Sequence, residues 1–103
     1  MTTPLTAEEA QRLLAENRAK IDALDRKIVD LLNERTKMAE QIGRAKMALG
    51  SPVQEPRREE NVFRNVTLHN HGPIPDEALR RIYEHIMVEM RALQGMQREP
   101  NGE

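Results

Sequence analysis

The chain has 103 residues, a size that fits one domain with a modest hydrophobic core, and we predict a single domain over residues 1–103 whose ordered part covers about residues 7–96. A net charge of −1 and the lack of a long apolar run predict neither a nucleic-acid partner nor a membrane span. There is no cysteine and no signal-peptide pattern, so we expect a cytoplasmic protein without disulfides. One Tyr, one Phe and no Trp favour helix packing over a sheet.

The first predicted helix is long. Thr6 and Glu9 have the spacing of a capping box, in which two side chains satisfy free backbone N–H groups at a helix start. From there to about Met47 no proline intervenes, and Gly50 followed by Pro52 predicts the end of the helix. The pattern therefore predicts one helix of about 40 residues.

Two shorter helices follow. Pro56 suits the first turn of a second helix, which we expect to run to about Asn70. After a polar loop, Pro75 and Asp76 open a third helix, because an acidic residue is favoured near a helix N-terminus. We expect the tail, residues 97–103, to be frayed. The predicted fold class is therefore all-α, with one long and two shorter helices in each chain.

An apolar seam with helical spacing runs along the first predicted helix. Its two rows are Leu14, Ile21, Ile28, Arg35 and Ile42, and Asn17, Leu24, Leu31, Met38 and Ala45. A helix of about 40 residues is about 60 Å long, whereas a compact globule of this size is roughly 33 Å across. The seam must extend beyond any core that one chain can form. We therefore expect an intertwined helical homodimer that covers it.

Arg35 interrupts this seam, and burying its charge costs several kcal/mol unless an anion meets it. Lys46 lies eleven residues further on, ~16 Å along nearly the same helix face, so both cations can reach one small ligand. Arg18 is about 25 Å from Arg35 in the same helix but can approach it from the partner of an antiparallel dimer. We predict an anion site across the dimer interface. The alternative is that Arg35 only sets helix register or reaches out to water.

Six short motifs follow one another in order over residues 12–95. They are Arg18-x-x-Ile21-x-x-Leu24-Asp25, Leu31-Leu32-x-Glu34-Arg35, Ile42-Gly43-x-Ala45-Lys46, Pro52-Val53-x-Glu55-Pro56-x-Arg58-Glu59, Ile82-Tyr83-x-x-Ile86 and Arg91-Ala92-Leu93-Gln94. Each motif alone is compatible with an ordinary amphipathic helix. The ordered set at these spacings resembles the all-helical class of chorismate mutase, which implies an all-helical dimer that acts on chorismate.

The resemblance also implies a role for each residue of the site. Arg35 and Arg18 of the partner subunit would hold the two carboxylates of chorismate. Lys46 and Gln94 would donate hydrogen bonds to its ether oxygen, and Glu59 would accept one from its ring hydroxyl. The implied catalytic residues are therefore Lys46, Gln94, Arg35 and Glu59.

Further residues would complete the substrate-binding site. Glu55 would line the ring end of the substrate, Arg58 would order these carboxylates, and Ile42 and Met87 would form apolar walls. Met90 departs from the family pattern, because many members carry a small hydroxyl residue there that helps to bind a carboxylate. A methionine side chain cannot donate that hydrogen bond, so carboxylate binding is weaker or the arginines contribute more.

The implied reaction is the intramolecular rearrangement of chorismate to prephenate, which requires no nucleophile, metal ion or cofactor. It requires a dianion held in a compact conformer and donors aimed at an oxygen that gains negative charge. Chorismate is therefore the small-molecule partner that we expect, with no metal site and no cofactor. A partner enzyme of the shikimate pathway is left open by the resemblance.

Two other functions are compatible with the same fold. One is an isochorismate-pyruvate lyase, although the stretch from Glu55 to Glu59 and Gln94 fit the mutase better. The other is a non-catalytic helical module that regulates or docks onto an enzyme of the aromatic amino-acid pathway. A third alternative, a coiled coil that serves only for dimerisation, does not explain why Arg35 and Lys46 lie in one stripe of the helix.

Each site residue also has a structural alternative. Lys46 could act only on the helix dipole, because a cation near a helix C-terminus contributes about 0.3–1 kcal/mol in this way. Glu55 could cap the second helix, and Arg58 and Glu59 could form a solvated charge pair. Gln94 could be a surface amide.

Overall fold

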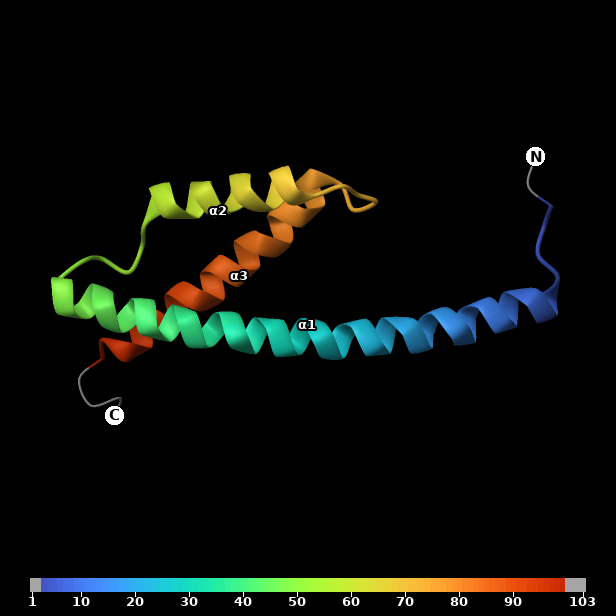
Figure 1. The fold of residues 1–103 in the computed structure, drawn as a ribbon, viewed down its shortest axis with the longest axis horizontal. Coiled ribbons are helices and arrows are strands. Elements are labelled where there is room, and N and C mark those ends of the chain that lie inside the picture. Colours follow the sequence, from blue (N-terminus) through green and yellow to red (C-terminus); the bar gives the residue numbers. More distant parts are fainter. Residues whose placement is uncertain (1–2, 100–103) are drawn as a thin grey trace. The chain divides into compact units, whose positions relative to one another are not determined.

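A computed structural model describes residues 3–99, and within this range the chain forms α-helices and turns but no strand. The helices are α1 (Ala7–Leu49), α2 (Pro56–His69) and α3 (Asp76–Gln97), drawn in Figure 1. This confirms the predicted all-α class with one long and two shorter helices. The chain consists of two units, residues 1–35 and 36–103, and α1 contributes to both. Over residues 3–99, no helix is both long and apolar enough to cross a membrane.

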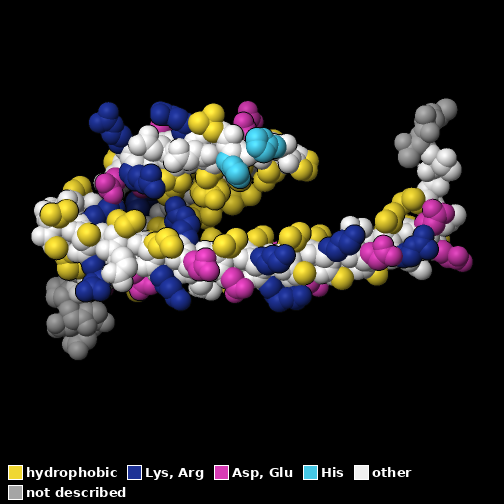
Figure 2. Space-filling view, in the orientation of Figure 1, with side chains coloured by type: hydrophobic (Ala, Val, Ile, Leu, Met, Phe, Trp, Pro, Cys, Tyr) yellow, Lys and Arg dark blue, Asp and Glu magenta, His cyan; other side chains and the backbone are white. Residues whose placement is uncertain are grey.

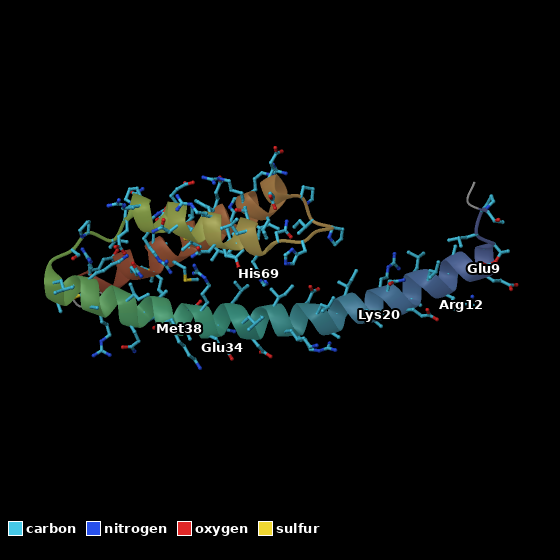
Figure 3. All side chains as sticks on the ribbon, turned by 45° about the horizontal axis from the view of Figure 1, so that its top comes forward. Glu9, Arg12, Lys20, Glu34, Met38 and His69 are labelled. Atoms are coloured by element: carbon cyan, nitrogen blue, oxygen red, sulfur yellow. The ribbon has the colours of Figure 1, made fainter. Side chains whose placement is uncertain are left out.

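The capping motif at the start of α1 forms with a changed partner. The backbone N–H of Glu9 donates to Thr6 Oγ1 at 3.1 Å, as the spacing predicts. The Thr6 hydroxyl donates in turn to Glu9 Oε1 at 2.9 Å, so the carboxylate contacts the hydroxyl and not the backbone N–H of Thr6. Figure 3 labels Glu9 at this end of the helix.

In the first unit, the apolar seam of α1 is exposed. The side chains of its apolar members are between 51% and 62% exposed: Leu14, Ile21, Leu24, Ile28 and Leu31. Figure 2 shows apolar side chains recurring along α1 among charged ones. Because single exposed apolar residues are normal but a continuous apolar stripe is not, this face has the character of an interaction surface.

The second unit is held together by a small core with one member from each helix. Ala39 of α1, Phe63 of α2 and Met87 of α3 are buried. The guanidinium of Arg80 lies 4.2 Å from the centre of the Phe63 ring, and it also pairs with Glu60 at 3.1 Å. These two contacts join α3 to α2 beside the core.

One side chain organises the loop between α2 and α3. The amide nitrogen of Asn70 donates to the carbonyl of Ile74 at 2.8 Å and to Asp76 Oδ1 at 2.7 Å, and its oxygen accepts from the N–H of Gly72 at 3.1 Å. Gly72 has a φ of 73°, a conformation that favours glycine. Asn70 is the C-cap of α2, so the helix ends at His69, next to the predicted end.

Helix α3 extends one residue into the predicted tail, residues 97–103. Gln97 is the last residue of α3, and its side-chain amide donates to the carbonyl of Glu40 on α1 at 3.1 Å. The guanidinium of Arg98 donates to the carbonyl of Ser51. These contacts join residues at the start of the predicted tail to distant segments of the chain. Residues 100–103 of the predicted tail lie outside the described residues.

We expect Asn70→Ala to lower the free energy of unfolding by about 1–2 kcal/mol, because three hydrogen bonds of the loop are lost and the groups left behind are partly solvated. Urea unfolding at fixed protein concentration measures this. Asn65→Ala, at an exposed position on α2, is the control and should shift stability by at most about 0.5 kcal/mol. Equal losses in the two variants would contradict the role of Asn70.

Candidate active site

Lys46, in the last turn of α1, makes three polar contacts with two other segments. Its ammonium group donates to the carbonyl of Val53 at 2.7 Å and to Gln94 Oε1 at 2.9 Å, and pairs with Glu55 Oε1 at 2.9 Å. An ammonium carries three N–H donors, so these acceptors match its full capacity. The side chain is 13% exposed. A role limited to the helix dipole does not account for contacts this specific.

Gln94 of α3 is buried, with 5% of its surface exposed, so the alternative of a surface amide is wrong. Its Nε2 donates to the carbonyl of Ala39 at 2.9 Å, while its Oε1 accepts from Lys46. Both ends of the amide are therefore fixed by α1. Because an amide nitrogen carries two N–H groups, one remains beyond the bond to Ala39.

Glu55 precedes α2 and occupies its N-cap position, but its side chain makes no capping hydrogen bond. The carboxylate instead contacts Lys46, which makes the predicted capping alternative wrong. The side chain is 46% exposed, far more than that of Lys46. Lys46, Gln94 and Glu55 thus form one polar cluster, in which Glu55 faces water.

A second ion pair joins α2 to α3. Glu59 Oε1 lies 2.5 Å from Arg91 Nη1, and both side chains are partly buried. The alternative of a solvated pair between Arg58 and Glu59 is therefore wrong, and Arg58 is exposed. Arg91 was not predicted as a site residue. A signal was present, because Arg91 lies three residues before Gln94 and so shares its face of α3.

The predicted apolar wall residues differ in burial. Met87 is buried and lies seven residues, two turns, before Gln94, on the same face of α3. Met90, one turn before Gln94, is partly buried. Ile42 on α1 is half exposed. Met87 and Met90 thus share one face of α3 with Gln94, as the spacing in the sequence predicts.

The two arginines of the predicted anion site belong to the first unit. Arg18 is exposed on α1 and Arg35 is partly buried. Both lie on the helix that carries the exposed apolar seam. Their approach to Lys46 and Gln94 stays a prediction.

The histidine pair near the end of α2 does not form a metal site by itself. The rings of His69 and His71 lie 5.9 Å apart, tilted by 51°. Across residues 3–99, no group of three or more His, Cys, Asp or Glu residues is arranged to hold a metal ion.

The family model described as chorismate mutase type II matches residues 17–95. The chain belongs to the chorismate mutase type II family. The match includes the residues of the polar cluster and the Glu59–Arg91 pair. It confirms the resemblance found in the sequence motifs.

Relatives and a solved structure agree with this family. A bifunctional chorismate mutase/prephenate dehydratase of Neisseria gonorrhoeae is 36% identical over 88 residues, which are 85% of this chain and 24% of that protein. A chorismate mutase of Methanocaldococcus jannaschii is 42% identical over 50 residues, 48% of this chain and 50% of that protein. The chain thus spans about a quarter of the first relative and half of the second.

The structure resembles the chorismate mutase (form II) of Thermus thermophilus. The TM-score is 0.77 at 33% sequence identity, and the match covers 85% of this chain and 98% of that one. The chain therefore carries a chorismate mutase type II domain with the fold of a solved chorismate mutase.

We expect Lys46→Met to lower the free energy of unfolding by about 1–3 kcal/mol, because the buried Oε1 of Gln94 loses its donor. Urea unfolding at fixed protein concentration tests this. Lys37→Met, at an exposed position on the same helix, is the matched control and should change stability little. A wild-type value for Lys46→Met would show that the contact with Gln94 does not contribute to stability.

Proposed function

We propose that this protein is a chorismate mutase, which rearranges chorismate to prephenate. The observation that carries the proposal is the contact between Lys46 and the buried Gln94 within a chorismate mutase type II domain. One cationic and one neutral donor, held side by side in a largely buried position, suit an ether oxygen that gains negative charge. Preorganised donors of this kind are typically worth about 3–4 kcal/mol each.

The fixed geometry of the cluster supports the roles that we assign to Lys46 and Gln94. The ammonium is held by Val53, Glu55 and Gln94, and the amide is held by Lys46 and Ala39. The amide of Gln94 is in place before the substrate arrives, whereas Lys46 would exchange one of its three acceptors, the exposed carboxylate of Glu55, for the ether oxygen. The amide retains one N–H beyond its bond to Ala39, and we assign this N–H to the ether oxygen.

The ring end of the substrate is assigned to the carboxylates. Glu59 would accept a hydrogen bond from the ring hydroxyl, and Arg91 holds the Glu59 carboxylate from α3. Glu55 and Arg58 would lie at the same end. The apolar wall is assigned to the buried Met87, with Met90 and Ile42 at its border.

We further propose that the site is completed in a homodimer. The exposed apolar seam of α1 supports this, because a second copy would remove it from water. Arg35 and Arg18 of the partner subunit would then bind the two carboxylates. An enzyme of the same pathway as a functional partner is a further proposal, supported by the relatives whose names pair chorismate mutase with prephenate dehydratase.

The direct test follows the loss of chorismate by absorbance with purified protein and identifies the product. Prephenate as the product, and a rate lowered at least ~10²-fold in kcat/KM by Lys46→Ala, supports the proposal. The variant also controls for a contaminating enzyme. No turnover of chorismate by the wild-type protein would refute the proposed function, and pyruvate release from isochorismate would identify a lyase instead.

Gln94→Glu should make activity strongly dependent on pH. Only a protonated carboxyl can donate a hydrogen bond, and a carboxylate would place negative charge beside an oxygen that gains charge. We expect activity to collapse at neutral pH and to recover in part as the pH falls toward the pKa of the introduced carboxyl group. The ordinary pKa of a Glu side chain is about 4.3, and burial raises it. Measuring kcat/KM from about pH 4.5 to about pH 8 for variant and wild type tests this. Profiles that superimpose would remove Gln94 from the site.

Mixing two inactive variants tests the shared site. Arg18→Ala and Arg35→Ala subunits, combined under conditions that allow exchange, should form heterodimers with one intact site and one doubly altered site. With random reassortment, about a quarter of wild-type activity should return. Each variant mixed with itself is the control. If exchange occurs and no activity returns, the two arginines do not act across an interface.

A further inference from the structure

Gly43 lies on α1 where two glutamine side chains of α3 cross its backbone. It is buried, and a Cβ atom at this position would overlap Gln97 Oε1 and lie 3.0 Å from Gln94 Cγ. Real Cβ contacts are almost never as short as the first and rarely as short as the second. The missing side chain therefore permits the two glutamines to lie against α1.

The two glutamines differ in their freedom to move. Gln97 is held through one exposed hydrogen bond to the carbonyl of Glu40, and its Oε1 is buried without a hydrogen-bond partner among the described residues. Its terminal amide can swing away at little cost. The amide of Gln94 is bonded at both ends, to Lys46 and to the carbonyl of Ala39, so a shift of its Cγ away from Gly43 strains these bonds.

We infer that Gly43 is a positioning residue for Gln94. By leaving room for Cγ, it lets the buried amide reach both the ammonium of Lys46 and the carbonyl of Ala39. Any side chain at this position would displace the amide from the donor arrangement described above. The catalytic consequence rests on the proposed function, whereas the effect on the Gln94 amide does not.

The test begins with Gly43→Ala. We expect kcat to fall by ~10-fold or more, because small misplacements of a catalytic donor are costly, with KM changed by no more than about threefold. Gln97→Ala is the matched control, since it removes the other contact at Gly43, and its kcat should stay within about twofold of wild type. An unchanged kcat in Gly43→Ala, or an equal loss in Gln97→Ala, would overturn the inference.

A double-mutant cycle separates positioning from general destabilisation. Gln94→Ala removes Cγ, so Gly43→Ala should cause no further loss of kcat in that background, measured at higher protein concentration. Losses that multiply would mean that Gly43 acts independently of Gln94. If Gly43→Ala alone does not fold, Gly43→Ala/Gln97→Ala replaces it, because only the contact with Gln94 then remains.

A readout without turnover keeps the two proposals apart. The side-chain amide signals of Gln94 in a ¹⁵N-labelled protein are identified by their loss in Gln94→Ala. We expect these signals to shift strongly in Gly43→Ala and much less in Gln97→Ala. If wild-type protein fails to turn over chorismate, the proposed function fails and the signals still test the inference. Unshifted signals in a folded Gly43→Ala protein would overturn it.

Discussion

The arrangement of the second unit depends on the polar contacts of the Lys46 ammonium group. It joins the end of α1 to the segment before α2, through Val53 and Glu55, and to α3 through Gln94. Burying a cation costs free energy unless each of its N–H groups has an acceptor. All three acceptors of Lys46 are therefore needed. The carbonyl of Ser51, which accepts from Arg98, ties the same connecting segment to the end of α3. The geometry of the polar cluster and the packing of the helices therefore depend on each other.

Such an arrangement suits a reaction in which the protein forms no covalent bond. The described cluster offers donors and acceptors whose directions are set by neighbouring backbone and side chains, and its two proposed donors, Lys46 and Gln94, lie on the regular helices α1 and α3. A site built on helices holds its groups more closely than one built on loops. A small all-helical domain is therefore sufficient where positioning and charge are the main requirements.

Local signals in the sequence were sufficient for the helices. Thr6, Pro56 and Pro75 mark helix starts through interactions within a few residues, and the structure places the starts accordingly. Lys46 and Gln94 could be paired only through the ordered set of motifs, since 48 residues separate them. The family supplied that constraint, and the structure brings the two side chains into contact.

The partners that were missed depend on packing between helices. Neither the pairing of Arg91 with Glu59 nor the contact of Gln97 with Glu40 has a short-range signature, because each joins residues of different helices. Gln97 was predicted to belong to the tail because it lies near the end of the chain. The roles of Arg18 and Arg35 stay a prediction, because Arg18 is proposed to act from a second copy of the chain and no pattern within one chain can test that.

The exposed carboxylate of Glu55 gives the cluster an internal counter-ion. An anionic ligand that reaches Lys46 meets an ammonium already neutralised, so its binding is an exchange of one anion for another. The net electrostatic gain is then the difference between two ion pairs, smaller than the attraction of a bare cation. In return, the ammonium is held in place while no ligand is bound, and a small inorganic anion would gain little by displacing Glu55.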